Sequence, residues 1–209
     1  MVSESKQVFI FGYSGHAFVV IETLLEAGYS ITGYFDYQVA TKNPYQLSYL
    51  GFEGKVDVKS IVQDHLVFPA VGENSIREKL VHLFDVFNLK QFVAIDPSAQ
   101  VSKTAQIGTS TYVGKNVAIN AQAVIGRGAI INTQATIEHE CRVEDFVHIA
   151  PNAVLCGNVH IEKKSFVGAN TVVRQNISIT SDVVAGAGSV VVKSIKEKGI
   201  WVGNPAKKI

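Results

Sequence analysis

A histidine followed directly by a glutamate, His139-Glu140, is the pair in this sequence best suited to proton transfer. An imidazole changes protonation state near neutral pH, and a neighbouring carboxylate can hold one ring nitrogen and make the ring a better base. Glu138, before the histidine, is the less favoured partner. The pair therefore predicts a general base, although a solvated surface histidine would show the same two residue types.

Two more histidines and two cysteines raise the question of a metal site. His148 follows His139 by nine residues and His160 follows His148 by twelve. Three imidazoles can bind zinc, but these spacings scatter them around the repeat described below, so the ligands would have to come from two subunits. We therefore expect no metal. Cys141 and Cys156 are too few for a disulfide scaffold.

A glycine turn near the N-terminus, Gly12-Tyr13-Ser14-Gly15-His16-Ala17, separates an apolar run from a helical pattern. Backbone N–H groups at the start of a helix bind phosphate, and Asp36 ends the next apolar run, where nucleotide-binding folds place an acid. The spacing is not G-x-G-x-x-G, so it does not predict NAD. Both a phosphate-containing ligand and an ordinary turn fit these residues.

The elements around this turn alternate between two patterns. The expected order is strand 7–11, helix 16–27, strand 31–35, strand 66–71 and helix 74–89. In the second helix one face collects the apolar residues Ile76, Leu80, Leu83, Phe84 and Phe87. Asn74 or Ser75 is its expected N-cap. Alternating strands and helices indicate a small parallel α/β sheet of Rossmann-like type.

The second half obeys a six-residue period. From Ile95 to Val191 every sixth residue is Val, Ile or Leu, with Ala185 the exception, and four places after each stands a mostly small residue. This is a hexapeptide repeat, in which each hexad forms a short strand and a turn, and three hexads close one coil. Residues 18 apart should therefore stack, which puts Gly157 beside His139.

The register also sorts the candidate residues. His139 follows the inward Ile137 by two places and falls on a turn, whereas Cys141 occupies a small inward place and is no nucleophile. We expect domains at residues 1–94 and 95–194. Residues 195–209 leave the register and are expected to form a short helix or loop that ends in a basic strip.

Composition and charge narrow the classes of protein. The chain has 209 residues, a net charge of +1 and 47% hydrophobic residues, which excludes disorder and gives no basic excess for nucleic acid. No apolar stretch approaches the roughly 18 residues of a membrane helix. The N-terminal apolar run lacks the features of a signal peptide. A soluble, cytoplasmic protein is expected.

With both halves placed, the chain resembles the bacterial sugar acetyltransferases of the PglD and NeuD type. The resemblance spans essentially all residues and rests on the glycine turn, Asp36, Gly72-Glu73-Asn74, Ile137-Glu138-His139-Glu140-Cys141 and the ending Val202-Gly203-Asn204-Pro205-Ala206. It implies a left-handed parallel β-helix, a homotrimer, and acetyl-CoA bound between neighbouring β-helices. It further implies transfer of acetyl to the 4-amino group of a UDP-linked 4-amino-4,6-dideoxy-N-acetyl sugar, on the way to N,N′-diacetylbacillosamine.

The resemblance also implies roles for individual residues. His139 is the catalytic base and Glu140 raises its basicity. The residues implied to bind acetyl-CoA are His148, Gly157, Ala169 and Ala187; the two alanines depart from the Ile and Gly of relatives. Those implied to bind the nucleotide sugar are Ser14, Gly15, His16, Asp36 and Gly72. Tyr37 stands where relatives often carry a second acid, and Lys207-Lys208 could meet the 3′-phosphate of CoA.

Three rival functions remain open at this point. Two belong to the same class: acetylation of a GDP-linked amino sugar such as perosamine, and O-acetylation of a sialic acid. The third is a non-catalytic nucleotide-sugar-binding protein, against which the Glu-His-Glu segment argues.

Overall fold

The computed structural model describes residues 6–209; the first five residues of the expected N-terminal domain lie outside the described residues. The domain is built on a parallel sheet in the order β2-β1-β3-β4. Its strands are β1 (Gln7–Phe11), β2 (Ser30–Phe35), β3 (Leu66–Pro69) and β4 (Lys90–Gln91). The expected α/β architecture is confirmed, with β4 as a strand that the sequence patterns did not predict.

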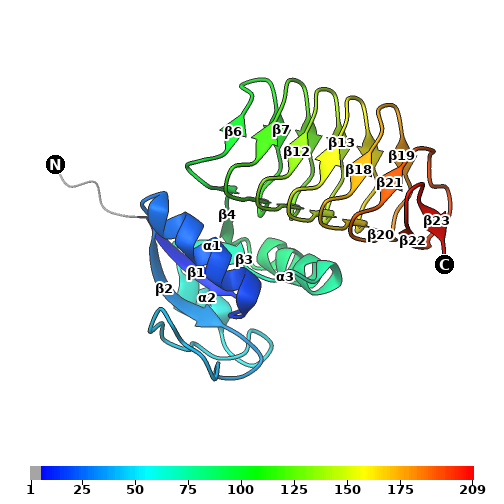
Figure 1. The fold of residues 1–209 in the computed structure, drawn as a ribbon. Coiled ribbons are helices and arrows are strands. Elements are labelled where there is room, and N and C mark those ends of the chain that lie inside the picture. The colour runs from blue at the N-terminus through cyan, green and yellow to red at the C-terminus, as the bar shows by residue number, and fades with distance from the viewer. Residues whose placement is uncertain (1–5) are drawn as a thin grey trace.

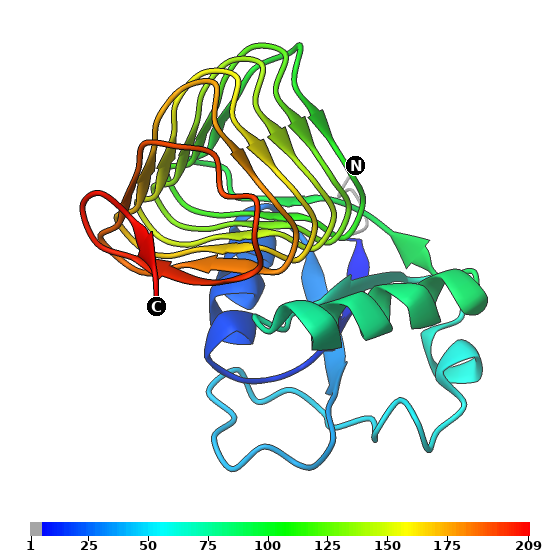
Figure 2. The same ribbon diagram turned by 90° about the vertical axis from the view of Figure 1, so that its right-hand side faces the viewer.

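Helices cover both faces of this sheet. The helices are α1 (Gly15–Glu26), α2 (Val58–Val62) and α3 (Asn74–Val86). Successive side chains of a strand point to opposite faces, so Val8 and Ile10 pack with α1, whereas Phe9 and Phe11 pack with α2 and α3. Figures 1 and 2 show α1 between the sheet and the second domain.

Two details of α3 differ from the sequence prediction. Its N-cap is Glu73, whose carboxylate accepts from the backbone N–H groups of Ser75 and Ile76, and not Asn74 or Ser75. Ile76, expected on the apolar face, is 49% exposed, whereas Arg77 is buried in its place. The buried face of the helix is turned about the helix axis relative to the predicted face, because α3 packs against the second domain as well as against the sheet.

The second domain is a three-sided solenoid, seen end-on in Figure 2. We call its sheets the junction, second and third sheets. The junction sheet contains β5 (Ala94–Ile95), β8 (Tyr112–Val113), β11 (Ile130–Ile131), β14 (His148–Ile149), β17 (Phe166–Val167), β20 (Val183–Ala185), β22 (Gly199–Val202) and β23 (Lys207–Lys208). The second sheet contains β6 (Gln100–Val101), β9 (Ala118–Ile119), β12 (Thr136–Ile137), β15 (Val154–Leu155), β18 (Val172–Val173) and β21 (Val190–Val191). The third sheet contains β7 (Gln106–Ile107), β10 (Val124–Ile125), β13 (Arg142–Val143), β16 (His160–Ile161) and β19 (Ser178–Ile179).

The hexad prediction explains this architecture. Residues 18 apart pair in parallel, as Thr136 does with Val154, and the aliphatic residue of each strand from Val113 onward fills a continuous core. Every sixth residue from Ser110 to Gly188 has a left-handed φ between 55° and 70°. The chain turns there from one sheet to the next, and Asn and Gly are common at these places because they adopt this conformation most easily.

The C-terminal segment corrects one expectation. Residues 195–209 form no helix; β22 continues the junction sheet beside β20, and β23 folds back antiparallel on β22. Trp201 packs against the end of the solenoid core. The repeat had ended in the sequence, but the open end of the core still requires a cover, which these two strands and Trp201 provide.

The two domains share a continuous interface. The junction sheet faces α1, and Tyr112 and Ile130 on its outer side belong to the same apolar cluster as Val20 and Leu24 of α1. Helix α3 runs along the turns between the third and junction sheets. One turn of this helix rises about 5.4 Å, and successive coils of the solenoid lie about 4.8 Å apart, so the two spacings nearly match. Contacts therefore recur along its length, from Asn74 to Asp85.

Candidate active site

His139 lies on the turn between β12 and β13, at the edge shared by the second and third sheets. Its side chain is 58% exposed, and its Nδ1 lies 3.1 Å from Oε2 of Glu140. A carboxylate only accepts, so the ring proton of the neutral imidazole belongs on Nδ1 and the lone pair on Nε2. Glu140 takes the left-handed turn conformation, with φ at 62°. The pair presents a free basic nitrogen to solvent.

Gly157 lies in the next coil, directly beside this imidazole. A Cβ atom at Gly157 would stand 2.5 Å from Cε1 and 2.7 Å from Nε2 of His139. The backbone of the two coils stays joined there, because the N–H of Asn158 donates to the His139 carbonyl at 2.9 Å. The missing side chain therefore leaves room for the imidazole, which packs over the Gly157 backbone.

Cys141, directly after this turn, is a poor nucleophile. Cys141 is buried, and its thiol donates to the Cys156 carbonyl at 3.2 Å. Burial raises the pKa of the Cys141 thiol to about 11. Since the thiolate is the reactive form, a covalent acetyl-cysteine at this position is disfavoured.

Three of the residues expected to bind a nucleotide sugar line one cavity in the first domain. Ser14, Gly15 and Asp36 surround about 330 Å³ at the carboxyl ends of β1 and β2. The Asp36 carboxylate accepts from the backbone N–H groups of Tyr13 at 2.8 Å and Tyr37 at 2.6 Å. It thus holds the glycine turn against the end of β2, besides facing the cavity.

His16 and Gly72, expected at the same nucleotide-sugar site, lie at the junction of the two domains instead. The His16 ring stands edge-on to Tyr112 at 5.4 Å, and a Cβ atom at Gly72 would be 3.7 Å from His16 Cβ. Burial, and secondarily the charge of Arg77, lowers the pKa of His16 to about 4. Its Nε2 is buried with no hydrogen-bond partner among residues 6–209.

His148 lies beside His16, on β14 of the junction sheet, with the two ring centres 6.4 Å apart. Its Nε2 is 3.2 Å from Nδ2 of Asn132, whose Oδ1 accepts from the N–H of Thr133 at 2.8 Å. Burial, followed by the charges of Arg77 and His16, lowers the pKa of His148 to about 3. Both junction histidines are therefore neutral at physiological pH.

The remaining residues expected to bind acetyl-CoA occupy a different edge of the solenoid. Ala169 and Ala187 follow β17 and β20 on the turns between the junction and second sheets, and the N–H of Gly188 donates to the Ala169 carbonyl at 2.8 Å. The whole width of the second sheet separates this edge from the edge that carries His139 and Gly157. One chain does not bring these four residues together.

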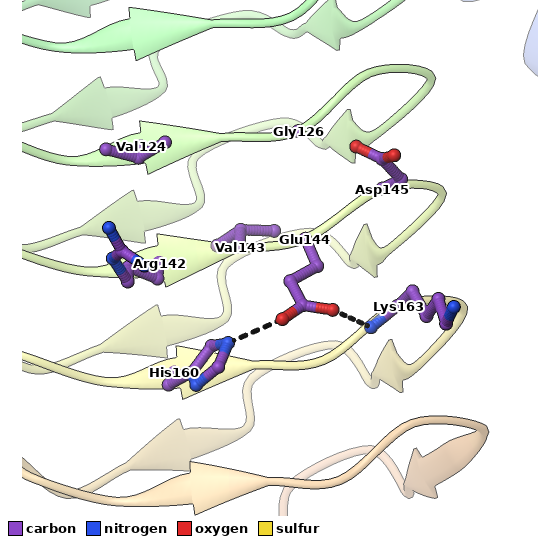
Figure 3. A pocket seen from close by; sticks show the side chains of 8 residues that line it. All are labelled: Val124, Gly126, Arg142, Val143, Glu144, Asp145, His160 and Lys163. Atoms are coloured by element: carbon purple, nitrogen blue, oxygen red, sulfur yellow. Dashed lines mark hydrogen bonds and ion pairs between the residues drawn. The ribbon is translucent and has the colours of Figure 1, made fainter.

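One further pocket contains none of the expected site residues. A pocket of about 380 Å³ on the third sheet, shown in Figure 3, is lined by Arg142, Glu144 and His160 among others. There the Glu144 carboxylate binds His160 Nε2 at 2.8 Å and the Lys163 N–H at 3.1 Å. No cluster of three metal-ligating side chains occurs among the described residues. Lys208, part of the basic strip that could meet the 3′-phosphate of CoA, pairs with Glu197 at 3.0 Å.

Sequence reasoning missed Arg77, the largest fully buried side chain at the junction. The signal was present, since Arg77 shares the helical spacing of the buried residues Leu80, Val81 and Phe84. A charged residue on an apolar stripe implies a set of buried acceptors, and a sequence does not reveal acceptors that another domain supplies.

Comparison with known protein families gives one match for each half of the chain. Residues 7–84 match the PglD N-terminal domain family, and residues 89–201 match the GMPPB C-terminal domain family. In the part of the chain that the structure describes, no helix is long and apolar enough to cross a membrane.

Two solved structures resemble the chain over nearly its full length. PerB from Caulobacter crescentus, in complex with CoA and GDP-perosamine, is 33% identical, with a TM-score of 0.90 and 96% of each chain covered. The acetyltransferase domain of PglB from Neisseria gonorrhoeae, in complex with acetyl coenzyme A, is 31% identical, with a TM-score of 0.89, covering 98% of this chain and 100% of that domain. WeeI from Acinetobacter baumannii, at 21% identity and a TM-score of 0.85, shares the fold.

The α/β domain joined to a left-handed hexapeptide-repeat β-helix, with the exposed His139–Glu140 pair on its edge, defines an acyltransferase of the β-helix class. The matches to known proteins narrow this class to one family. The chain belongs to the acetyl-CoA-dependent sugar N-acetyltransferases with a PglD-type N-terminal domain.

Proposed function

We propose that this enzyme transfers acetyl from acetyl-CoA to the 4-amino group of a nucleotide-linked 4-amino-4,6-dideoxy sugar, with His139 as general base. The observation that carries the proposal is the exposed imidazole of His139, with Nδ1 held by Glu140 and the ring packed over Gly157, which has no side chain to displace it. Since acetyl-CoA is an intracellular metabolite, the proposed site of action is the cytoplasm.

The chemistry follows from this geometry. An ammonium group cannot attack a thioester, so Nε2 of His139 takes a proton from the sugar amine as its nitrogen bonds to the acetyl carbonyl carbon. The carbon–sulfur bond then breaks. The CoA sulfur leaves with the electron pair and receives the proton from the imidazolium, and the Glu140 carboxylate stabilises that cation while it lasts. The acetyl group passes directly to the amine, because Cys141 is a buried thiol.

We propose a homotrimer in which acetyl-CoA lies between neighbouring solenoids. Two features support this. His139 and Gly157 occupy one edge of the solenoid, while Ala169 and Ala187 occupy another, so a second copy is needed to combine them. Four of the six outward residues of the second sheet are apolar, namely Ala118, Val154, Val172 and Val190, beside Gln100 and Thr136, whereas those of the third sheet include Arg142 and His160. The second sheet is the better face for a partner copy.

Two nucleotide sugars fit the acceptor role. The first is the UDP-linked 4-amino-4,6-dideoxy-N-acetyl sugar that the sequence resemblance implies, and the similarity to the PglB acetyltransferase domain is compatible with it. The second is GDP-perosamine, favoured by 33% identity to a protein solved with that sugar. In either case the cavity at Ser14, Gly15 and Asp36 would hold the nucleotide.

The test is a panel of UDP- and GDP-linked 4-amino sugars and a sialic acid, each incubated with acetyl-CoA and assayed for CoA release and product mass. Acetylation of one nucleotide-linked amino sugar, with a mass increase of one acetyl group, is the expected result. Acetylation of sialic acid alone would replace the proposed acceptor. Binding of a nucleotide sugar without any CoA release would instead indicate a non-catalytic binding protein.

A further inference from the structure

Arg77 of α3 is the one fully buried guanidinium of the described residues, at 1% exposure, and it joins the two domains. Its Nε donates to the Gly128 carbonyl at 2.6 Å, and its Nη2 donates to the Phe146 carbonyl at 3.2 Å, both on turns of the solenoid. Within residues 6–209 no carboxylate pairs with it directly. Five fixed donors in one plane suit a cluster of carbonyl oxygens better than a lysine would.

The third nitrogen of the guanidinium, Nη1, binds the loop between β3 and α3. Nη1 of Arg77 donates to the carbonyls of Val71 at 3.1 Å and Gly72 at 3.0 Å. In a trans peptide the N–H points away from the preceding carbonyl. The N–H groups of Gly72 and Glu73 therefore face away from Arg77, and neither donates a hydrogen bond within the described chain. Gly72 and Glu73 also line a groove of about 470 Å³ beside the junction sheet.

Arg77 binds the Gly72 carbonyl, and the His148 ring lies near the same carbonyl. The amide nitrogen of Asn132 can only donate, so Nε2 of His148 accepts its hydrogen bond and carries no proton. The single ring proton then lies on Nδ1, on the side of the ring near the backbone carbonyl of Gly72. Arg77 binds that carbonyl and also the carbonyl of Phe146, two residues before His148, so one side chain ties the Gly72 loop to the chain segment that carries the histidine.

We propose that Arg77 is a positioning residue of the acetyl transfer: it sets the Gly72 carbonyl of the nucleotide-sugar domain against the Nδ1 side of His148, whose Nε2 is held by Asn132 in the solenoid. The expected effect of Arg77 on turnover rests on the proposed function, whereas its effect on the His148 ring can be measured without any substrate. The groups that face the two histidines are Arg77 from α3, Tyr112 from β8 and the histidines themselves.

The first test compares Arg77→Gln and Arg77→Lys with Arg127→Gln. Arg127 is a matched control, because it also joins α3 to the solenoid, through Asp85 at 2.7 Å, but touches neither Gly72 nor His148. Arg77→Gln should raise the KM for the nucleotide sugar about tenfold or more, as expected for loss of a hydrogen bond to a charged group. Arg127→Gln should leave that KM within about twofold. A folded Arg77→Gln enzyme with the wild-type KM overturns the proposal.

The second test is nitrogen-15 NMR of the histidine rings, which needs no turnover. In the wild type, His148 should carry its proton on Nδ1 and stay neutral well below the ordinary histidine range. Its titration should move to higher pH in Arg77→Gln, whereas Arg77→Lys, which keeps the charge but not the planar fork, should retain the low titration without restoring the KM. A wild-type proton on Nε2 refutes the arrangement, even if the variants fail to fold. If no nucleotide sugar is acetylated but Nδ1 carries the proton, only the proposed function fails.

Discussion

Gly157→Ala is a substitution whose effect can be worked out from the structure. The new Cβ would lie 2.5 Å from Cε1 of His139, where ordinary carbon contacts are about 3.5 Å or longer. The imidazole must therefore move by about 1 Å, and a displacement of that size at a reacting group costs about 10²-fold in rate. Gly157 has no left-handed φ, so the backbone accepts alanine without strain. The expected result is kcat lowered about 10²-fold, or about 2.7 kcal/mol of barrier, with an unchanged melting temperature.

The assay is initial-rate CoA release at saturating substrates, with the double variant His139→Ala/Gly157→Ala as control. If the alanine acts only by displacing the imidazole, adding it to His139→Ala should cost nothing further. A Gly157→Ala enzyme with wild-type kcat would show that catalysis does not depend on the position of the imidazole over Gly157. An additional loss in the double variant would show that Gly157 contributes separately, as through the predicted contact with acetyl-CoA.

Three further predictions follow from the same geometry. Asp36→Ala should raise the KM for the nucleotide sugar and leave that for acetyl-CoA nearly unchanged, because Asp36 lines the first-domain cavity and holds its glycine turn; a rise in the acetyl-CoA KM instead would contradict this division of labour. Burial in the folded protein lowers the pKa of His16 from 6.5 to about 4 and that of His148 from 6.5 to about 3. These two histidines should therefore contribute their full stabilisation of the fold above pH 6.5. As the pH falls from there towards 4, the unfolded chain takes up the protons first, so the free energy of unfolding should decrease by up to about 1.4 kcal/mol per pH unit for each histidine; a flat urea midpoint across this window would refute their neutral burial. Light scattering at micromolar concentration should report the mass of three chains, and a mass of one or two chains would exclude the proposed trimer.

The repeat made the solenoid predictable from the sequence. An aliphatic residue every six places from Ile95 to Val191 can be buried only if hexads stack, so the pairing of residues 18 apart and the closeness of Gly157 to His139 both follow from counting. The first domain was predictable in type for a similar reason, since its strands and long helices carry strong apolar patterns. The ends of elements, such as the Glu73 cap of α3, depend on side-chain hydrogen bonds that no period records.

The relation between the two domains could not be obtained in this way. His16 belongs to the glycine turn in the sequence, yet its ring lies against Tyr112 and near His148 in the solenoid, away from the cavity lined by Ser14. Arg77 was overlooked because its acceptors, the carbonyls of Gly128 and Phe146, come from the other domain. Both cases depend on contacts between segments more than 50 residues apart, which neither periodicity nor a local motif encodes.

The turnover of His139→Ala tests the central claim most directly. At a pH of about 7.5, roughly one unit above the ordinary histidine pKa, kcat for the acetylated nucleotide sugar should fall by about 10²–10⁴, the usual effect of losing a positioned base. The dissociation constant of acetyl-CoA, measured by calorimetry, should change little, because the lost interaction belongs to the transition state. A His139→Ala enzyme that keeps the wild-type kcat would remove this histidine from the mechanism and leave the amine to react in its already deprotonated form.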